Sequence, residues 1–196
     1  MNLGRHPKYC YHEAGHAVAF WHHGIEIEYV TVNSFDSEHF GEVKTVSHEV
    51  ISLAEVEAEM KCAAAGEIAT RAFSKRREDL ANDWLIECFT HDATRFTEDP
   101  NIRDDDRRRF AEMGLARDIE TRKAAPEAAT GPVTWLPVFR ETERLIRVEL
   151  WPAIQAVANE LSQNPADLWQ QDVAALAATA LNRTAPSTGR RSQVTR

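Results

Sequence analysis

The spacing of apolar positions predicts a mostly helical chain with one early patch of β structure. Apolar residues recur every three or four positions from Tyr9 to His22, which is typical of a helix, and Gly24 follows as a stop signal. The alternating segment 25–32 (IEIEYVTV) predicts a strand. Segment 41–46 (GEVKTV) predicts its partner across a polar turn. We therefore expect a helix followed by a small β-hairpin.

Helices are predicted for most of the remaining chain. Ser52 and Glu55 have the spacing of a capping box, and the helix that they open is expected to reach about Phe73. Further helical spacing covers 83–96, 138–150, 152–161 and 166–181. The charged segment 97–109 is expected as a solvated loop that enters another helix, and the proline-containing segment 124–137 as a linker or exposed loop. The fold class predicted is α+β, mostly α, with terminal helices.

Composition narrows the class of protein. With 196 residues, 43% of them hydrophobic and 28% charged, the chain fits one globular domain, which we place at 1–182, followed by a disordered basic tail at 183–196. A net charge of −8 argues against nucleic-acid binding, and no apolar run approaches the roughly 18 residues of a membrane span. Three cysteines without paired spacing, and no signal peptide, predict a cytoplasmic protein.

The segment His12-Glu13-Ala14-Gly15-His16 carries the candidate chemistry. Residues four apart share one face of a helix, so His12 and His16 can bind one zinc ion. Glu13 lies beside that face and can take a proton from a zinc-bound water, then return it to a leaving amine. Chance gives about 0.03 such patterns in a chain of this composition. This disfavours the alternative that both histidines are ordinary surface residues.

The segment YHEAGHAV (11–18) resembles the zinc peptidase domain of the FtsH family. In that family a small β element follows the HEAGHA helix, then come a helix with a small-residue patch and a zinc-binding aspartate at the start of the next helix. The corresponding segments here are 25–46, Ala65-Gly66-Glu67 and Ala81-Asn82-Asp83. The resemblance implies a zincin-like metallopeptidase fold, a zinc cofactor and hydrolysis of peptide bonds.

FtsH proteins also carry a membrane anchor and an ATPase module. The sequence contains no GxxxxGK[ST] phosphate-binding motif, so we expect an ATP-independent peptidase. Its expected substrates are flexible segments of peptides or proteins. The alternative function is a catalytically inactive, zinc-stabilised binding or regulatory module. Glu13 weighs against that alternative because metal binding alone does not need it.

Four acidic residues are candidates for the third zinc ligand. Glu67 belongs to the small-residue patch, where the equivalent acid of the FtsH family is not a ligand, and Asp79 lies in a charged run. Asp92 lies within a continuous helical pattern. Asp83 resembles the family's ligand and would lie in a first helical turn, where negative charge is favoured. We predict Asp83, with Asp92 as the second choice.

Several other residues are given structural roles. His22 falls where metzincins have a third histidine, but Ala19 replaces the glycine that would turn the chain, so His22 is predicted at the helix end instead. Cys10 is expected in the core. The block 104–109 (DDDRRR) is expected as a solvated helix start. Three tryptophans are also expected in the core: Trp135, Trp151 and Trp169.

Overall fold

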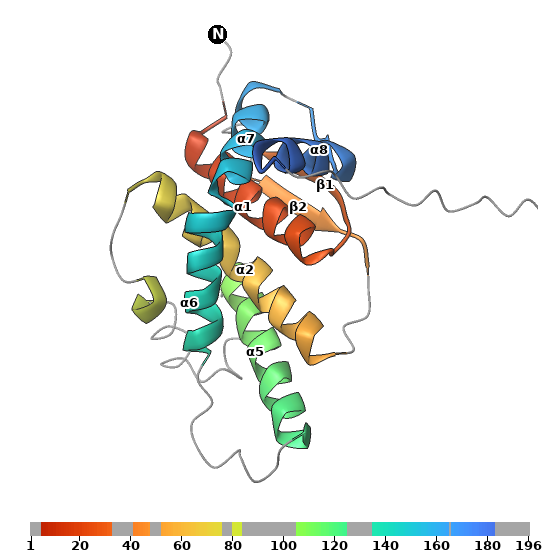
Figure 1. Cartoon of the computed structure of the whole chain (residues 1–196), viewed down its shortest axis with the longest axis vertical. Helices are drawn as coiled ribbons and strands as arrows, with labels where there is room; N and C mark the ends of the chain where they lie inside the picture. Colours follow the sequence, from red (N-terminus) through yellow and green to blue (C-terminus); the bar gives the residue numbers. More distant parts are fainter. Residues whose placement is uncertain are drawn as a thin grey trace, which may run out of the picture.

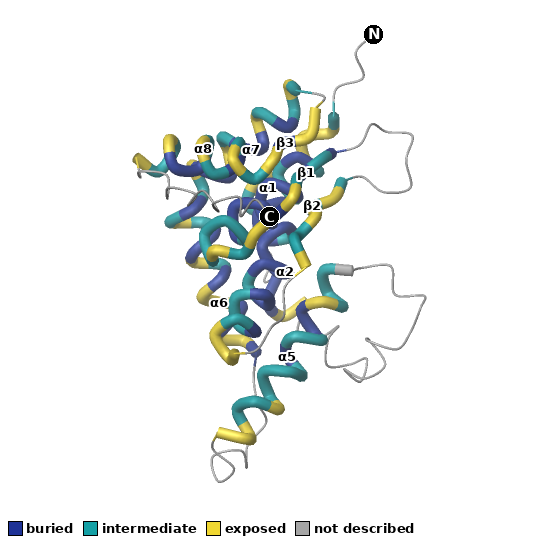
Figure 2. Tube along the Cα trace, turned by 90° about the vertical axis from the view of Figure 1, so that its right-hand side faces the viewer, coloured by how far each residue is buried: buried dark blue, intermediate teal, exposed yellow. Residues whose placement is uncertain are grey.

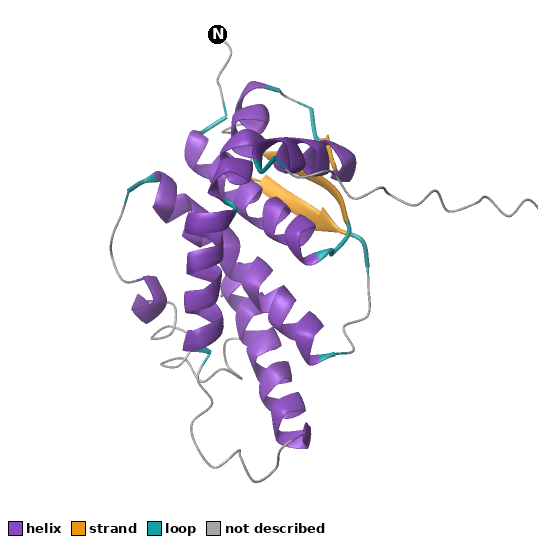
Figure 3. Cartoon of the chain, viewed as in Figure 1, coloured by secondary structure: helices purple, strands orange, loops and turns teal. Residues whose placement is uncertain are grey.

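A small sheet lies at one side of a bundle of helices in the computed structural model, which describes residues 5–32, 41–47, 52–75, 80–83, 105–124, 135–164 and 166–182 (Figures 1 and 3). The elements in chain order are α1 (Pro7–His23), β1 (Ile27–Val32), β2 (Gly41–Thr45), α2 (Leu53–Phe73), α5 (Asp105–Ala124), α6 (Leu136–Arg144), the π-helix η2 (Leu145–Glu149), α7 (Trp151–Gln163), β3 (Leu168–Trp169) and α8 (Gln170–Ala180). The prediction of a mostly helical α+β chain is confirmed.

Local signals placed the first elements correctly. Gly24 ends α1 in the left-handed conformation, with φ of 72°, which glycine adopts without strain. Ser52 and Glu55 form the expected capping box: the Ser52 hydroxyl accepts from the Glu55 N–H, and the Glu55 carboxylate accepts from the Ser52 N–H. Strands β1 and β2 pair antiparallel, as predicted.

The last helix begins later than its pattern predicted. Leu168 and Trp169 form the short strand β3, which pairs antiparallel with β1 through Val30 and Tyr29, so α8 starts at Gln170 and not at 166. The strand order is β2-β1-β3. Pairing with β1 is a long-range interaction that helical spacing does not register. The predicted segments 84–96, 97–104, 125–134 and 183–196 lie outside the described residues.

The helices α1 and α2 approach each other closely at the centre of the molecule, where α2 is dark blue in Figure 2. A β-carbon built on Gly15 would lie 2.7 Å from the Ala65 carbonyl oxygen and 2.8 Å from the Ala69 β-carbon. Only a residue without a side chain fits between the two backbones. The small-residue patch around Ala65 and Gly66 therefore allows the close approach of the two helices.

The predicted core residues have different outcomes. Trp135 and Cys10 are each 1% exposed and belong to the core, as predicted. Trp151 is half-buried at its margin. The prediction for Trp169 is wrong: its side chain is 53% exposed because β3 is a short edge strand. Within the described ranges, no helix is long and apolar enough to cross a membrane.

Because α1 and α2 lie so close together at Gly15, a larger residue there should destabilise the fold. Gly15→Ala should lower the free energy of unfolding by roughly 1 to 3 kcal/mol, because the added methyl forces the two helices apart. Gly24→Asn on the same helix is the control, since no atom lies within 4 Å of its β-carbon and asparagine tolerates positive φ. Urea denaturation measures both variants, and equal stability of the two would contradict the tight contact.

Candidate metal centre

Three side chains converge where α1, α2 and α5 meet. His12 Nε2 and His16 Nε2 lie 3.2 Å apart, one helical turn from each other on α1. Asp106 Oδ2, from the first turn of α5, lies 2.9 Å from His12 Nε2 and 3.1 Å from His16 Nε2. Each of the three residues offers one nitrogen or oxygen atom of the kind that binds metals, and together they could hold one metal ion.

Residues of α2 contact the Nδ1 atom of each imidazole. His16 Nδ1 lies 2.8 Å from the backbone carbonyl oxygen of Cys62, to which it can only donate. His12 Nδ1 lies 3.3 Å from the Thr70 hydroxyl. Because each Nδ1 faces α2, each Nε2 points to the centre of the group. Such outer contacts commonly fix the tautomer of metal-binding histidines.

Gly66 leaves the space in which His16 sits. A β-carbon built on Gly66 would overlap His16 Nε2, far inside van der Waals contact. Any side chain at this position would displace the imidazole nitrogen that faces Asp106. The small-residue patch therefore serves the site directly as well as the packing of α1 on α2.

Packing of α5 against α2 places Asp106. Phe110 lies one turn after Asp106 and is fully buried, so both residues belong to the inward face of α5. Arg109 donates to the buried Glu59 at 3.3 Å, and Arg117 donates to Glu57 at 2.8 Å. These two pairs join α5 to α2, and their order shows that the helices run antiparallel. They hold the first turn of α5 beside the histidines.

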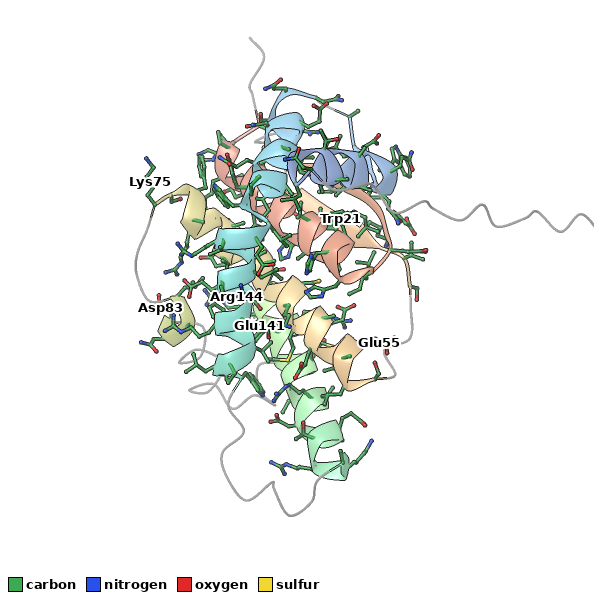
Figure 4. All side chains as sticks on the ribbon, viewed as in Figure 1. Trp21, Glu55, Lys75, Asp83, Glu141 and Arg144 are labelled. Atoms are coloured by element: carbon green, nitrogen blue, oxygen red, sulfur yellow. The ribbon has the colours of Figure 1, made fainter. Side chains whose placement is uncertain are left out.

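The predicted third ligand has to be reassigned. Asp83 lies 3.2 Å from the Arg71 guanidinium with its side chain 52% exposed, and Figure 4 places it at the outer edge of the molecule. The metal-ligating group does not include it. Glu67, another candidate, pairs with the same Arg71 at 3.0 Å. Asp106 therefore replaces Asp83 as the candidate ligand, while Asp79 and Asp92 lie outside the described residues.

The charged block 104–109 predicts a solvated helix start, but the structure places Asp106 of that block against His12 and His16. Its position four residues before Phe110 was the available signal, because a carboxylate on the apolar face of a helix needs a buried partner. His22 and His23 end α1, as predicted for His22. His22 is not part of the group found among the described residues.

Glu13 is buried beside the two histidines. Its side chain is 7% exposed, and a β-carbon on Gly41, the first residue of β2, would lie 2.6 Å from Glu13 Oε1. Burial raises the pKa of this carboxyl, and the neighbouring His16 and His12 oppose the shift. A carboxylate with a raised pKa accepts a proton more readily than an exposed one.

The acid and the histidines of the group shift one another's pKa values. Burial by itself lowers the pKa of His16, but the charge of Asp106 and its hydrogen bond outweigh that effect and raise the pKa to about 9. Burial by itself raises the pKa of Asp106. The charge of His16 and the hydrogen bonds with both histidines outweigh that effect and hold the pKa well below its usual range. In the metal-free protein a proton on His16 therefore balances Asp106.

The distances between ligand atoms fit a tetrahedral zinc ion. Zinc–nitrogen and zinc–oxygen bonds of about 2.0 to 2.2 Å place tetrahedral ligands roughly 3.3 Å apart. The three separations observed are 2.9, 3.1 and 3.2 Å. Two imidazoles and one carboxylate also match the ligand type of catalytic zinc sites, which keep a fourth position open. The side chains of His12 and Asp106 are 25% and 29% exposed, so the group is accessible from solvent.

Comparison of the chain with protein families finds no matching family, and comparison with curated proteins finds no match. The function of the group is therefore inferred from its own residues.

The reassigned ligand predicts the order of metal affinities. Asp106→Asn should weaken zinc binding by more than about 100-fold, because the amide removes the negative charge between the two histidines. Asp83→Asn should change it by less than about threefold, since Asp83 faces Arg71. Competition with a chromogenic chelator measures both variants. Stronger loss in Asp83→Asn would return the assignment to Asp83.

The raised pKa of His16 predicts a stability change with pH in the metal-free protein. A folded-state pKa of about 9 against 6.5 when unfolded gives a stabilising contribution that is present below pH 6.5 and lost as the pH rises to about 9. Asp106 stays ionised throughout this window because its pKa is lowered. In excess chelator, the free energy of unfolding should fall by up to roughly 3 kcal/mol between pH 6.5 and pH 9.5.

Substitution of single histidines controls this experiment. His16→Gln should remove the fall between pH 6.5 and about pH 8.5, whereas His22→Gln, on the same helix, should keep it. Above that pH a smaller fall remains in every variant, because burial raises the pKa of the Cys10 and Cys62 thiols. A wild-type stability that is constant from pH 6.5 to pH 9.5 would show that His16 is not protonated in the metal-free protein.

Proposed function

We propose that this protein is a zinc-dependent peptidase with a zincin-like fold similar to the peptidase domain of the FtsH family. The observation that carries the proposal is the convergence of His12, His16 and Asp106, with buried Glu13 beside them, on an H-E-x-x-H helix. A metal site that served only structure would be closed by a fourth protein ligand and would not need Glu13.

The chain's own residues divide the work of hydrolysis. His12 and His16 would hold zinc through Nε2, and Asp106 through Oδ2, with Cys62 and Thr70 keeping the imidazoles oriented. When bound, zinc lowers the pKa of its water and polarises the carbonyl under attack. Glu13 takes the proton of the attacking water on a carboxylate oxygen and delivers it to the nitrogen of the leaving amine. Its raised pKa favours the first transfer.

The strand β2 supplies the binding surface for an extended substrate. It is an edge of the described sheet, and its first residue, Gly41, lies against Glu13. A peptide that adds to this edge forms main-chain hydrogen bonds and runs past the general base. Because only an unfolded segment can add as a strand, the substrates proposed are flexible regions of peptides or proteins.

The role of Glu13 predicts a separation of metal binding from catalysis. Glu13→Gln should keep zinc affinity within about threefold and reduce hydrolysis of an unstructured protein such as casein by at least about 100-fold, because the amide cannot accept the proton. Glu120→Gln, on α5, is the matched control and should retain full activity, because the partly exposed Glu120 pairs with Lys123 and is not part of the candidate site. Elemental analysis and mass spectrometry of the products measure the two properties.

Two outcomes oppose the proposal. Equal hydrolysis by Glu13→Gln and the wild type would exclude Glu13 as the base. If the wild-type zinc protein cleaves none of a panel of unstructured proteins, the alternative of a zinc-stabilised binding module replaces the peptidase.

A further inference from the structure

A second candidate site lies between the end of α2, the start of α1 and the helices η2 and α7. A surface hollow of about 450 Å³ opens there. Its lining combines three aromatic residues with two cationic and one amide side chain: Tyr11, Phe73, Trp151, Lys75, Arg147 and Gln155. None of these residues belongs to the metal-ligating group.

The aromatic side chains form a stacked wall. The rings of Tyr11 and Phe73 lie 4.2 Å apart at 17°, and those of Tyr11 and Trp151 lie 5.5 Å apart at 24°. Phe73 remains 36% exposed, so the wall continues to the surface. Flat rings that stack within a protein also offer their faces to a planar ligand.

The charge of the hollow is opposite to that of the chain. The chain carries a net charge of −8, yet the described lining contains Lys75 and Arg147 and no acid. Arg147 Nε lies 3.2 Å from Glu143 Oε1, and one such contact uses a small part of a guanidinium with five N–H donors. An arginine in this setting can still bind a carboxylate through its other donors.

The backbone on both sides of the hollow is unusual. Arg147 belongs to the π-helix η2. This form is rare in proteins overall, and where it occurs it is frequently at a functional site. Lys75 has a φ of 54°, an uncommon conformation for a residue with a side chain, and stands beyond the end of α2 at the edge of the molecule (Figure 4). Both cations of the lining are therefore on segments that depart from regular helix.

We propose that this hollow binds a planar aromatic ring that carries a carboxylate. The ring stacks on the wall of Tyr11, Phe73 and Trp151, and the carboxylate binds Arg147, with Lys75 at the mouth. Free aromatic acids and peptides that end in an aromatic residue both carry such a ring and a carboxylate. The proposal does not depend on zinc or on hydrolysis.

Calorimetric titration with three matched probes tests the proposal. 2-Naphthoate should bind with one molecule per chain, and at least about tenfold more tightly than 2-naphthamide, which has the ring without the charge. Cyclohexanecarboxylate, which has the charge without a flat ring, should also bind at least about tenfold more weakly. Equal affinity for 2-naphthoate and 2-naphthamide, or no binding of 2-naphthoate, would overturn the proposal.

Two variants locate the binding. Arg147→Gln should weaken 2-naphthoate binding by about tenfold, and Phe73→Ala by a similar factor, with folding checked by circular dichroism. Arg144→Gln is the matched control, because Arg144 is the residue that precedes η2, pairs with Glu149 and does not line the hollow. If Arg144→Gln and Arg147→Gln weaken binding equally, the probe binds elsewhere.

Two further ligands distinguish the sources of the carboxylate. A hexapeptide that ends in phenylalanine, with a free carboxylate, should bind more tightly than N-acetylphenylalanine if the hollow recognises a chain terminus. Equal affinities indicate a free aromatic acid. The carboxamide form of the peptide should lose binding in either case, and its retention would overturn the role of the carboxylate.

Discussion

The close approach of α1 and α2 is the constraint on which the geometry of His12, His16 and Asp106, the candidate metal ligands, depends. Gly15 brings the α1 backbone against Ala65, and Gly66 leaves the space that His16 Nε2 occupies. At that separation the Cys62 carbonyl and the Thr70 hydroxyl of α2 reach the distal nitrogens of both histidines. A wider crossing would break these contacts together, and the imidazoles would turn freely. Glycine is thus needed here for distance and not for an unusual backbone angle.

Two acids beside the same pair of histidines acquire opposite properties. Asp106 contacts His12 and His16 directly, so its pKa is held low and it remains an anion suited to a cation. Glu13 is shielded from water by β2 at Gly41, so its pKa is raised. Direct contact with the imidazoles in one case, and burial in the other, separate an acid that holds a charge from an acid that can take a proton.

The sequence was sufficient for features set by neighbouring residues. The i and i+4 spacing of His12 and His16 follows from helix geometry, and Gly24 and Ser52 act on the backbone within a few residues of themselves. Asp106 is 90 residues from His16 and reaches it only because α5 docks onto α2, where Arg109 pairs with Glu59. The exposed Trp169 has the same explanation, because pairing of β3 with β1 decides its position. Local patterns do not contain such long-range contacts.

The metal-ligating group and the aromatic hollow are built on the same two helices. Tyr11 and His12 are consecutive on α1, so their side chains leave the helix about 100° apart, one toward the hollow and one toward Asp106. Thr70 and Phe73 lie about one turn apart on one side of α2, where Thr70 contacts His12 and Phe73 contacts Tyr11. Any rotation of α1 against α2 would displace both sets of side chains at once. The glycine-dependent crossing that orients the metal ligands therefore also fixes the aromatic wall.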